Sequence, residues 1–491
     1  MNHEIKYYQI YSFILCFFVQ RCSKYLDQEP DMRAQINTVD KVKRLVASAY
    51  PGRNSLAMAE TYSDNVEDKG VGDLYQPVPA LYEWKDIIGD DTDSPTAYWN
   101  SCYEAIAAAN HALDAIEKND FGADVLPYKG EALVARAYCH FMLANYFAKV
   151  YDPKSGASND SPGVPYVKEP ETVLIKKYDR GTVKSTYDNI RQDLEEGLAL
   201  LDKGKGLWDV PKYHFTPEAA HAFATRFYLF TGEWQKVVDN ANKIFGGNFT
   251  GKLIPYNSTF KTLGFESVRT EFAKAEQPYN LLINETYSGY QRWWNNRYAM
   301  GINVFQNIYN GMTAAGAKLY NFGVSYGSPH YTTYLWKEFW YVTNPTANTG
   351  YPMLMVPVLI TDEVLLNRAE AYAELGNTNS ALADLNLFAS NRINNYNPNT
   401  YAVTVAKSKD FFGVADDKEA LIETTLQFKQ IGFMSMGLRW FDIIRKGLTV
   451  RHNMIGNDER ETILELKPED PRRVFQIPQE AKLAGVELNP R

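Results

Sequence analysis

The sequence is poor in the residues that build covalent or metal-based frameworks. It contains four cysteines and seven histidines in 491 residues, and no histidine pair has the H-E-x-x-H spacing of a zinc site. Cys102 and Cys139 fall inside helical patterns, where a cysteine behaves as a small buried apolar residue. We therefore expect no metal and no other cofactor.

Clustered positive charge is also missing. The chain has 51 Lys and Arg against 59 Asp and Glu, a net charge of −8, and the charges are spread along its length. Nucleic-acid binding needs clustered Lys and Arg to neutralise phosphates. The sequence therefore argues against a nucleic-acid partner.

Long apolar runs are absent except near the start. A weakly basic segment ends at Lys6, and the apolar run 7–19 that follows is too short for a resident membrane helix. This pattern predicts a secretory signal peptide over residues 1–21. Cys22 then stands where a bacterial lipoprotein would carry its acylated cysteine, although Val19, Gln20 and Arg21 are not the small residues that lipoprotein processing favours. We expect lipidation at Cys22 to be the only membrane attachment of the mature chain.

Two segments predict helical hairpins of the tetratricopeptide type. In residues 361–391, apolar residues recur at helical spacing on both sides of Gly376-Asn377, a pair suited to ending one helix before the next. The spacing of Tyr372, Gly376 and Ala381 matches that repeat, and residues 216–245 carry a second copy with Tyr228 and Gly232. An all-α dominated scaffold is predicted.

Further helices are expected over residues 97–118, 129–150, 185–201 and 418–446. By contrast, residues 52–93 and the long insertion 246–357 have little helical periodicity and many aromatic side chains. Long irregular segments in a compact protein are often functional. We therefore expect a large irregular, loop-rich region to bind the ligand.

Five segments in order resemble the SusD/RagB family of bacterial outer-membrane nutrient-binding lipoproteins. They are residues 22–27 (CSKYLD), the helix 131–152 followed by 163–166 (GVPY), the hairpin 361–385, residues 437–447 (GLRWFDIIRKG), and residues 475–478 (FQIP) with Glu480 and then 488–490 (LNP). The chain departs from the family at Met436, where a Glu is usual, and at the uncharged Gly432, Phe433 and Met434 before it. We expect these departures to fall on structural positions.

The resemblance implies one SusD-like domain over residues 22–491. Its parts would be an N-terminal part with helix pairs (24–245), the aromatic-rich insertion (246–357), and C-terminal helix pairs with an extended tail (358–491). It also implies a lipoprotein on the outward-facing surface of the outer membrane, acting with a SusC-like TonB-dependent transporter. The implied ligand is an oligosaccharide, or a peptide as in some members, and no catalysis is expected.

Glycan recognition needs flat aromatic faces with amide or carboxylate groups beside them. Aromatic side chains on helical faces, such as Tyr138, Tyr228 and Tyr372, are predicted to be core, as is Trp440. Loop residues are the better candidates. The predicted ligand-binding residues are Tyr75, Tyr82, Trp84, Tyr290, Trp293, Trp294, Asn296, Arg297, Tyr331 and Trp336, with Asn295 as a further polar neighbour.

A secreted serine hydrolase is the alternative from another class of protein. Residues 323–327 (GVSYG) fit the G-x-S-x-G pattern around Ser325, but that chemistry needs a strand before the serine and a helix after it. No helix signal follows, so a glycine-rich loop is favoured. Asp90, Asp91 and Asp93 match no complete calcium loop and are expected to form a solvated turn.

Overall fold

The computed structural model describes residues 36–171, 173, 176–204, 208–320, 324–325, 327–333 and 335–491. The predicted signal peptide and Cys22 lie outside these residues. Within the described ranges, no helix combines the length and the apolar character that crossing a bilayer requires.

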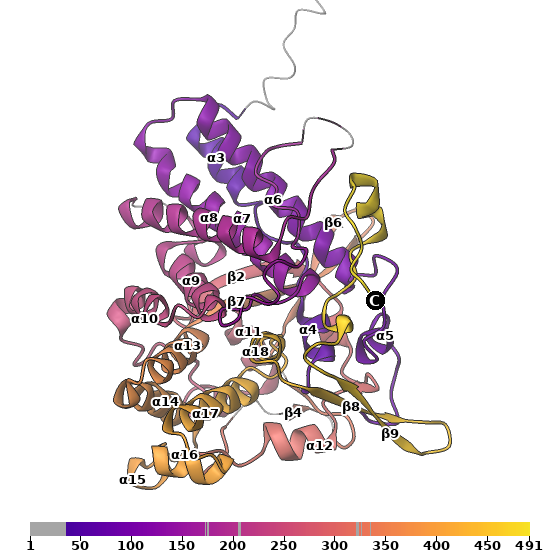
Figure 1. Ribbon diagram of the computed structural model, residues 1–491, viewed down its shortest axis with the longest axis vertical. Helices are drawn as coiled ribbons and strands as arrows, with labels where there is room; N and C mark the ends of the chain where they lie inside the picture. Colours follow the sequence, from indigo (N-terminus) through magenta and orange to yellow (C-terminus); the bar gives the residue numbers. More distant parts are fainter. Residues whose placement is uncertain are drawn as a thin grey trace, which may run out of the picture.

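Helices dominate, as predicted. Four of them pack together in the N-terminal part (Figure 1): α3 (Val39–Val46), α6 (Pro95–Lys118), α7 (Leu126–Phe147) and α8 (Val183–Lys203). Helix α7 is buried on almost every side, and it approaches α8 so closely that a Cβ added at Gly130 would lie 2.8 Å from the carbonyl oxygen of Gly197. Glycine at that crossing lets the two backbones meet.

Both predicted hairpins are present. They are α9 (Pro217–Thr231) with α10 (Trp234–Lys243), and α13 (Thr361–Glu374) with α14 (Thr378–Arg392). Gly232 and Gly376 end the first helix of each pair in the left-handed region, with φ of 70° and 75°, where glycine is unstrained. Helix α13 packs against α9 and α10, so the two hairpins adjoin although the insertion separates them in sequence.

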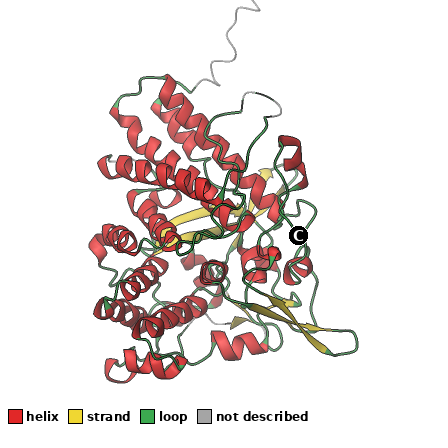
Figure 2. Cartoon of the chain, in the orientation of Figure 1, coloured by secondary structure: helices red, strands yellow, loops and turns green. Residues whose placement is uncertain are grey.

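The insertion contains a sheet that the sequence analysis did not predict. Strands β2 (Asn280–Tyr287), β6 (Glu338–Asn344) and β7 (Thr349–Ile360) form an antiparallel sheet in the order β2-β7-β6. Figure 2 shows strands running between the helices of the N-terminal part and those of the C-terminal part. Strand β6 is one of the two edge strands of this sheet, and most of it is exposed.

Two local predictions are wrong in a way that matters for the site. Residues 52–93 contain the buried helix α4 (Leu56–Tyr62) and the short helix α5 (Val78–Tyr82). The single helix expected over 418–446 is two helices, α17 (Asp417–Gly432) and α18 (Arg439–Lys446). The chain turns between them because Ser435 and Gly437 have φ of 67° and 72°, which a continuing helix excludes.

The remaining α-helices and strands of the described residues are short. They are β1 (Glu67–Asp68), α11 (Phe265–Phe272), β3 (Tyr298–Ala299), α12 (Ile302–Val304), β4 (Val324–Ser325), β5 (Thr332–Thr333), α15 (Pro398–Tyr401), α16 (Val405–Phe412), β8 (Val450–Ile455) and β9 (Glu461–Leu466). Strand β1 pairs with β3, β4 with β5, and β8 with β9.

The segment 437–447 is built into the scaffold. Trp440 is fully buried, and Arg445 donates to both carboxylate oxygens of Glu370 on α13, at 2.5 and 2.6 Å. Arg439 makes a two-point ion pair with Asp64, at 2.7 and 2.8 Å, just after α4. The expectation that Trp440 is structural agrees with this packing.

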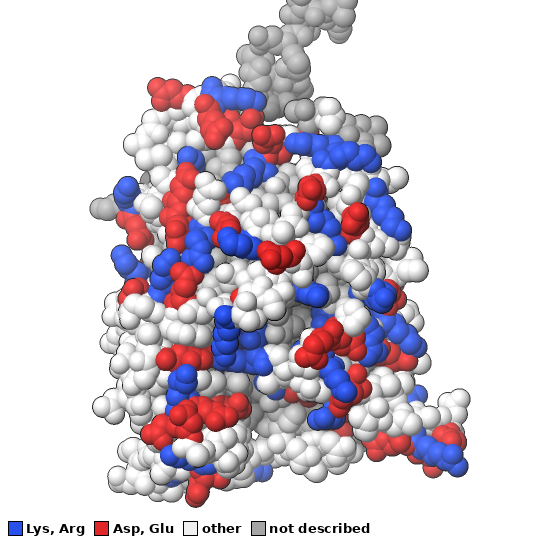
Figure 3. Space-filling view, in the orientation of Figure 1, with Lys and Arg blue, Asp and Glu red and all other residues white. Residues whose placement is uncertain are grey.

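Figure 3 shows acidic and basic side chains interspersed on the viewed face, without a broad area of one sign.

Candidate functional site

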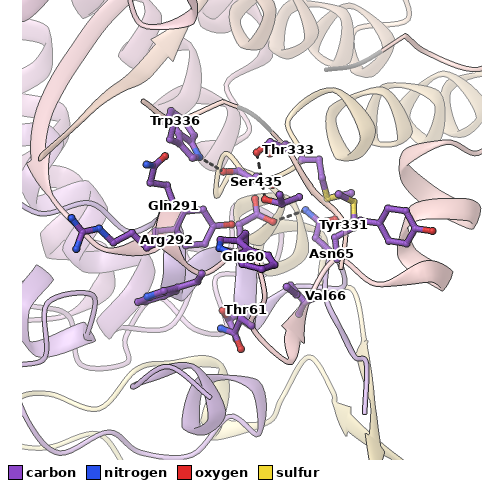
Figure 4. A pocket seen from close by; sticks show the side chains of 18 of the residues that line it. Glu60, Thr61, Asn65, Val66, Gln291, Arg292, Tyr331, Thr333, Trp336 and Ser435 are labelled. Atoms are coloured by element: carbon purple, nitrogen blue, oxygen red, sulfur yellow. Dashed lines mark hydrogen bonds between the residues drawn. The ribbon is translucent and has the colours of Figure 1, made fainter. Parts of the chain in front are cut away.

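A cavity of about 340 Å³ lies where the insertion meets α4 and the turn between α17 and α18. A volume of this order suits a small ligand or one end of a longer one. Figure 4 shows side chains from these separate segments converging on it. The lining residues are Glu60, Thr61, Asn65, Val66, Phe265, Arg269, Tyr290, Gln291, Arg292, Trp293, Trp294, Asn296, Tyr298, Ala299, Met300, Tyr331, Thr332, Thr333, Trp336, Met434 and Ser435.

Glu60, on the buried helix α4, brings a carboxyl group to the cavity. One of its oxygens accepts from Asn65 Nδ2 at 3.0 Å (Figure 4) and the other from the backbone N–H of Gly437 at 2.7 Å. The side chain is 3% exposed. Burial raises the pKa of this carboxyl from 4.5 to about 7, although both hydrogen bonds act to lower it. Near neutral pH the cavity can therefore hold Glu60 either charged or neutral.

Aromatic rings from the segment that follows β2 form one wall. Trp293 lies parallel to Tyr75, with 6.1 Å between ring centroids and 11° between planes, and edge-on to Tyr290. Tyr75 therefore supports Trp293 from outside the cavity. Trp294 is 39% exposed, so a ligand can reach its indole.

Tyr331 and Trp336 form another part of the lining. Tyr331 stacks on Phe305 at a centroid distance of 4.3 Å and an interplanar angle of 5°, which leaves only its other face open to a ligand. Trp336 is 4% exposed and donates its indole N–H to the Ser435 carbonyl at 3.3 Å (Figure 4). Trp336 is thus a fixed wall that offers little area for stacking.

The two arginines of the lining are engaged by neighbours. Arg292 makes a two-point ion pair with Glu338 at the start of β6, at 2.5 and 2.6 Å. Arg269 donates to the Trp336 carbonyl at 2.9 Å and lies 3.3 Å from Glu266. The positive charges at the rim are therefore partly neutralised, and the polar lining consists mainly of amides and hydroxyls such as Asn65, Gln291 and Thr332.

Six of the ten predicted ligand-binding residues line this cavity. They are Tyr290, Trp293, Trp294, Asn296, Tyr331 and Trp336. Asn296 is 2% exposed and its side-chain oxygen accepts from the N–H of Tyr298 at 3.1 Å, so it also shapes the turn.

Four predicted residues lie elsewhere, and two of them, Tyr82 and Trp84, are buried in the core, where a ligand cannot reach their rings. Tyr82 ends α5, and both rings are at most 1% exposed. They stack on the His452 ring, with centroids 4.2 and 4.4 Å away. The sequence around Tyr82 and Trp84 has no regular periodicity. His452, which lies on β8 and follows Tyr82 by 370 residues in the sequence, completes the buried cluster around both rings. Tyr75 packs against Trp293 on the side away from the cavity.

Arg297, predicted to contact ligand, lies outside the cavity lining and pairs with groups on two other segments. Its guanidinium donates to both carboxylate oxygens of Asp68 at 2.6 and 2.8 Å, and to the Ile455 carbonyl at 2.6 Å. This links the segment that carries Trp293 and Trp294 to β1 and β8.

Asp93 also corrects an expectation. Asp90 and Asp91 are exposed, but Asp93 is 3% exposed and not part of a solvated turn. Its carboxylate accepts from Ser288 Oγ at 2.6 Å and from the N–H of Gly289 at 2.9 Å, and burial raises the pKa of this carboxyl. Asp93 thus fixes the turn that leads into Tyr290.

Sequence reasoning missed several lining residues. Glu60 and Asn65 line the cavity, but they lie in residues 52–93, for which the sequence predicts no helix. Met434, predicted to be a structural residue, also lines the cavity, together with Ser435. A signal was available in Gly432 and Gly437, which bracket the turn. Two glycines five residues apart in a predicted helix indicate a break.

The hydrolase alternative lacks the required local structure. Ser325 ends β4, which pairs with β5 to form a hairpin, so the next element is a strand and not a helix. Tyr326 and the side chain of Ser325 lie outside the described residues. Among the residues that the structure describes, no three His, Cys, Asp or Glu side chains are grouped to hold a metal ion.

Comparison with known proteins identifies the relatives of this chain. A SusD-like family model, described as "Starch-binding associating with outer membrane", matches residues 24–229. A search among curated proteins finds no match.

Several solved structures share the fold. A SusD superfamily protein from Bacteroides thetaiotaomicron is 19% identical, with a TM-score of 0.61 over 92% of this chain and 100% of that one. A putative sugar binding protein from Bacteroides vulgatus is 18% identical, with a TM-score of 0.66 over 93% and 99% of the two chains. A SusD-like carbohydrate binding protein from Bacteroides vulgatus is 16% identical, with a TM-score of 0.60 over 91% and 97%.

Proposed function

Because the chain is a SusD-like family protein, we propose that it is a binding protein that captures an oligosaccharide and passes it to a SusC-like TonB-dependent outer-membrane transporter. It acts on the outward-facing surface, held there by a lipid on Cys22. It binds and does not catalyse.

The observation that carries the proposal is the composition of the cavity. Trp293, Trp294 and Tyr331 offer aromatic faces or edges, and Gln291, Asn65 and Thr332 offer amides and a hydroxyl beside them. Sugar rings present an apolar face ringed by hydroxyl groups, so they match this mixture, while the paired arginines give no strong preference for an anion. The family description, which names starch binding and the outer membrane, points the same way.

Affinity electrophoresis in gels containing soluble starch, xylan or galactomannan tests ligand class, and calorimetry with the matching oligosaccharides measures affinity. Trp294→Ala should weaken binding about tenfold, the equivalent of about 1.4 kcal/mol. Phe411→Ala is the matched control, because Phe411 is 44% exposed on α16 and does not line the cavity. If no polysaccharide binds and a casein tryptic digest does, the sugar proposal is replaced by a peptide-binding one.

Anchoring and partner are tested separately. Cys22→Ser in the full chain should move the protein from the membrane to the soluble fraction. Wild-type protein purified from detergent-solubilised outer membranes should bring a TonB-dependent barrel protein with it. Purification without such a barrel would contradict the transporter partnership and leave the binding proposal standing.

A further inference from the structure

The β6–β7 hairpin exposes more aromatic surface than its position in the sheet requires. Trp340 is 47%, Tyr341 53% and Tyr351 50% exposed. Single exposed aromatics are ordinary, so the face on which each ring lies, and what lies beside it, decides whether it can contact a ligand.

Beyond Glu338, the first residue of β6, the hairpin has no charged side chain. Between Glu338 and Asp362 the sequence has no Asp, Glu, Lys or Arg. An edge strand such as β6 is normally protected by charged side chains, whereas its polar groups here are neutral, including Thr343, Asn344 and, across the turn, Asn348. Rings combined with neutral amides and hydroxyls fit a neutral, hydroxyl-rich ligand better than an anionic or cationic one.

One side of the hairpin continues from the cavity. Successive side chains of a strand point to opposite faces, so Glu338 and Trp340 share a face and are about 7 Å apart along it. Glu338 is the residue that pairs with Arg292 of the cavity lining. Trp340 therefore lies on the face of β6 that adjoins the cavity, two residues beyond Glu338.

Gly350 supports this placement of the indole. It is cross-strand from Val342, on the same face as Trp340, and a Cβ added at Gly350 would clash with the backbone carbonyl of Tyr341 and would also lie 3.0 Å from Trp340 Nε1. The glycine leaves room for the Trp340 ring against the β7 backbone. Tyr341 points to the opposite face, where its cross-strand partner Tyr351 packs on Tyr287 with 5.5 Å between centroids.

We infer that the ligand is a neutral saccharide chain that extends out of the cavity, past the Arg292–Glu338 pair, and stacks one of its rings on Trp340. This rests on the proposed function and adds a length requirement to it. The cavity holds one end of the chain, and the cavity-side face of β6 holds its continuation.

The test compares chain lengths in two variants. Calorimetry measures binding of maltotriose and maltoheptaose, and of xylotriose and xylohexaose, with affinity electrophoresis in soluble starch and xylan. Wild type should bind the longer member of its preferred pair more tightly. Trp340→Ala should lose about tenfold in affinity for the longer chain and none for the trimer. Tyr341→Ala is the matched control, since it removes an equally exposed ring from the same strand on the opposite face, and should change neither.

The outcomes separate this inference from the proposed function. If Trp340→Ala leaves long-chain affinity unchanged while Trp294→Ala lowers it, the inference fails and the proposed function stands. If Trp340→Ala and Tyr341→Ala weaken binding equally, the hairpin acts as a whole, as in strand addition by a peptide, and the inference also fails. If the wild type binds none of these saccharides, both fail. Circular dichroism of each variant shows that the fold is retained.

Discussion

Glu60→Gln should remove a pH dependence from the stability of the folded chain. The Glu60 carboxyl has a pKa of about 7 in the fold because it is buried, against 4.5 for an ordinary Glu. The native state thus binds more protons at this site than the unfolded state does between those values. Since stability falls with pH wherever the native state holds more protons, the wild type loses stability as pH rises from about 4.5 to about 7, and the loss is complete above that range.

The size of the effect follows from the two pKa values. At about 1.4 kcal/mol per pH unit, the difference between 4.5 and about 7 corresponds to about 3.5 kcal/mol in the free energy of unfolding. About 2.5 kcal/mol of this should be lost between pH 5 and pH 8. Glutamine keeps an oxygen that can accept from the Gly437 N–H but cannot ionise, so the variant lacks this contribution.

Chemical denaturation at pH 5, 6, 7 and 8 measures the effect as the wild-type minus variant difference in unfolding free energy. Taking the difference cancels the other titrating groups. Glu117→Gln removes one carboxylate from the exposed side of α6 and shows the effect of net charge alone. If the wild type and Glu60→Gln change in parallel over this range, the Glu60 carboxyl ionises as in water and the reasoning is refuted.

Three further changes test the scaffold and the enzyme alternative. Arg226 donates to both carboxylate oxygens of the buried Glu363, at 2.6 and 2.7 Å. Arg226→Leu should therefore lower the free energy of unfolding by about 3–5 kcal/mol, because it leaves this carboxylate unpaired. Thermal denaturation should show that the double variant Arg226→Leu/Glu363→Leu recovers most of the lost stability. Gly432→Ala should cost about 1–3 kcal/mol by overpacking, since its Cβ would lie 2.9 Å from Phe388 Cζ; equal stability in denaturant titration would contradict this. Ser325→Ala should leave polysaccharide retardation in affinity gels unchanged, and a loss of it would revive a role for this serine.

The scaffold could be predicted because its signals are local. Helical spacing on both sides of a turn glycine is a property of about thirty adjacent residues, and Gly376 adopts the left-handed conformation that the pattern predicted. The Tyr228 and Tyr372 positions follow from the same periodicity. Packing of one hairpin on the next then needs only the apolar faces that the pattern already defines.

The lining of the candidate site was predicted in part, because much of it depends on contacts distant in sequence. A loop aromatic is a binding candidate only if nothing else covers it. The His452 ring covers Tyr82 and Trp84, and Asp68 pairs with Arg297. No local sequence pattern indicates that His452 and Asp68 are the partners of these residues. The sheet was missed for the same reason, since β2 and β7 pair across about seventy residues. In addition, buried and exposed residues do not alternate regularly along either strand.

The turn between α17 and α18 shows why scaffold and site are not separate in this protein. Its Gly437 begins the segment 437–447, whose Trp440 and Arg445 pack into the helical scaffold, and the N–H of Gly437 also holds the Glu60 carboxyl at 2.7 Å. Two residues earlier, the Ser435 carbonyl accepts from Trp336 of the cavity wall. A displacement of α18 therefore moves hydrogen-bond partners of both Glu60 and Trp336. The irregular aromatic segments supply the rings that line the cavity, and the scaffold sets their positions through this turn.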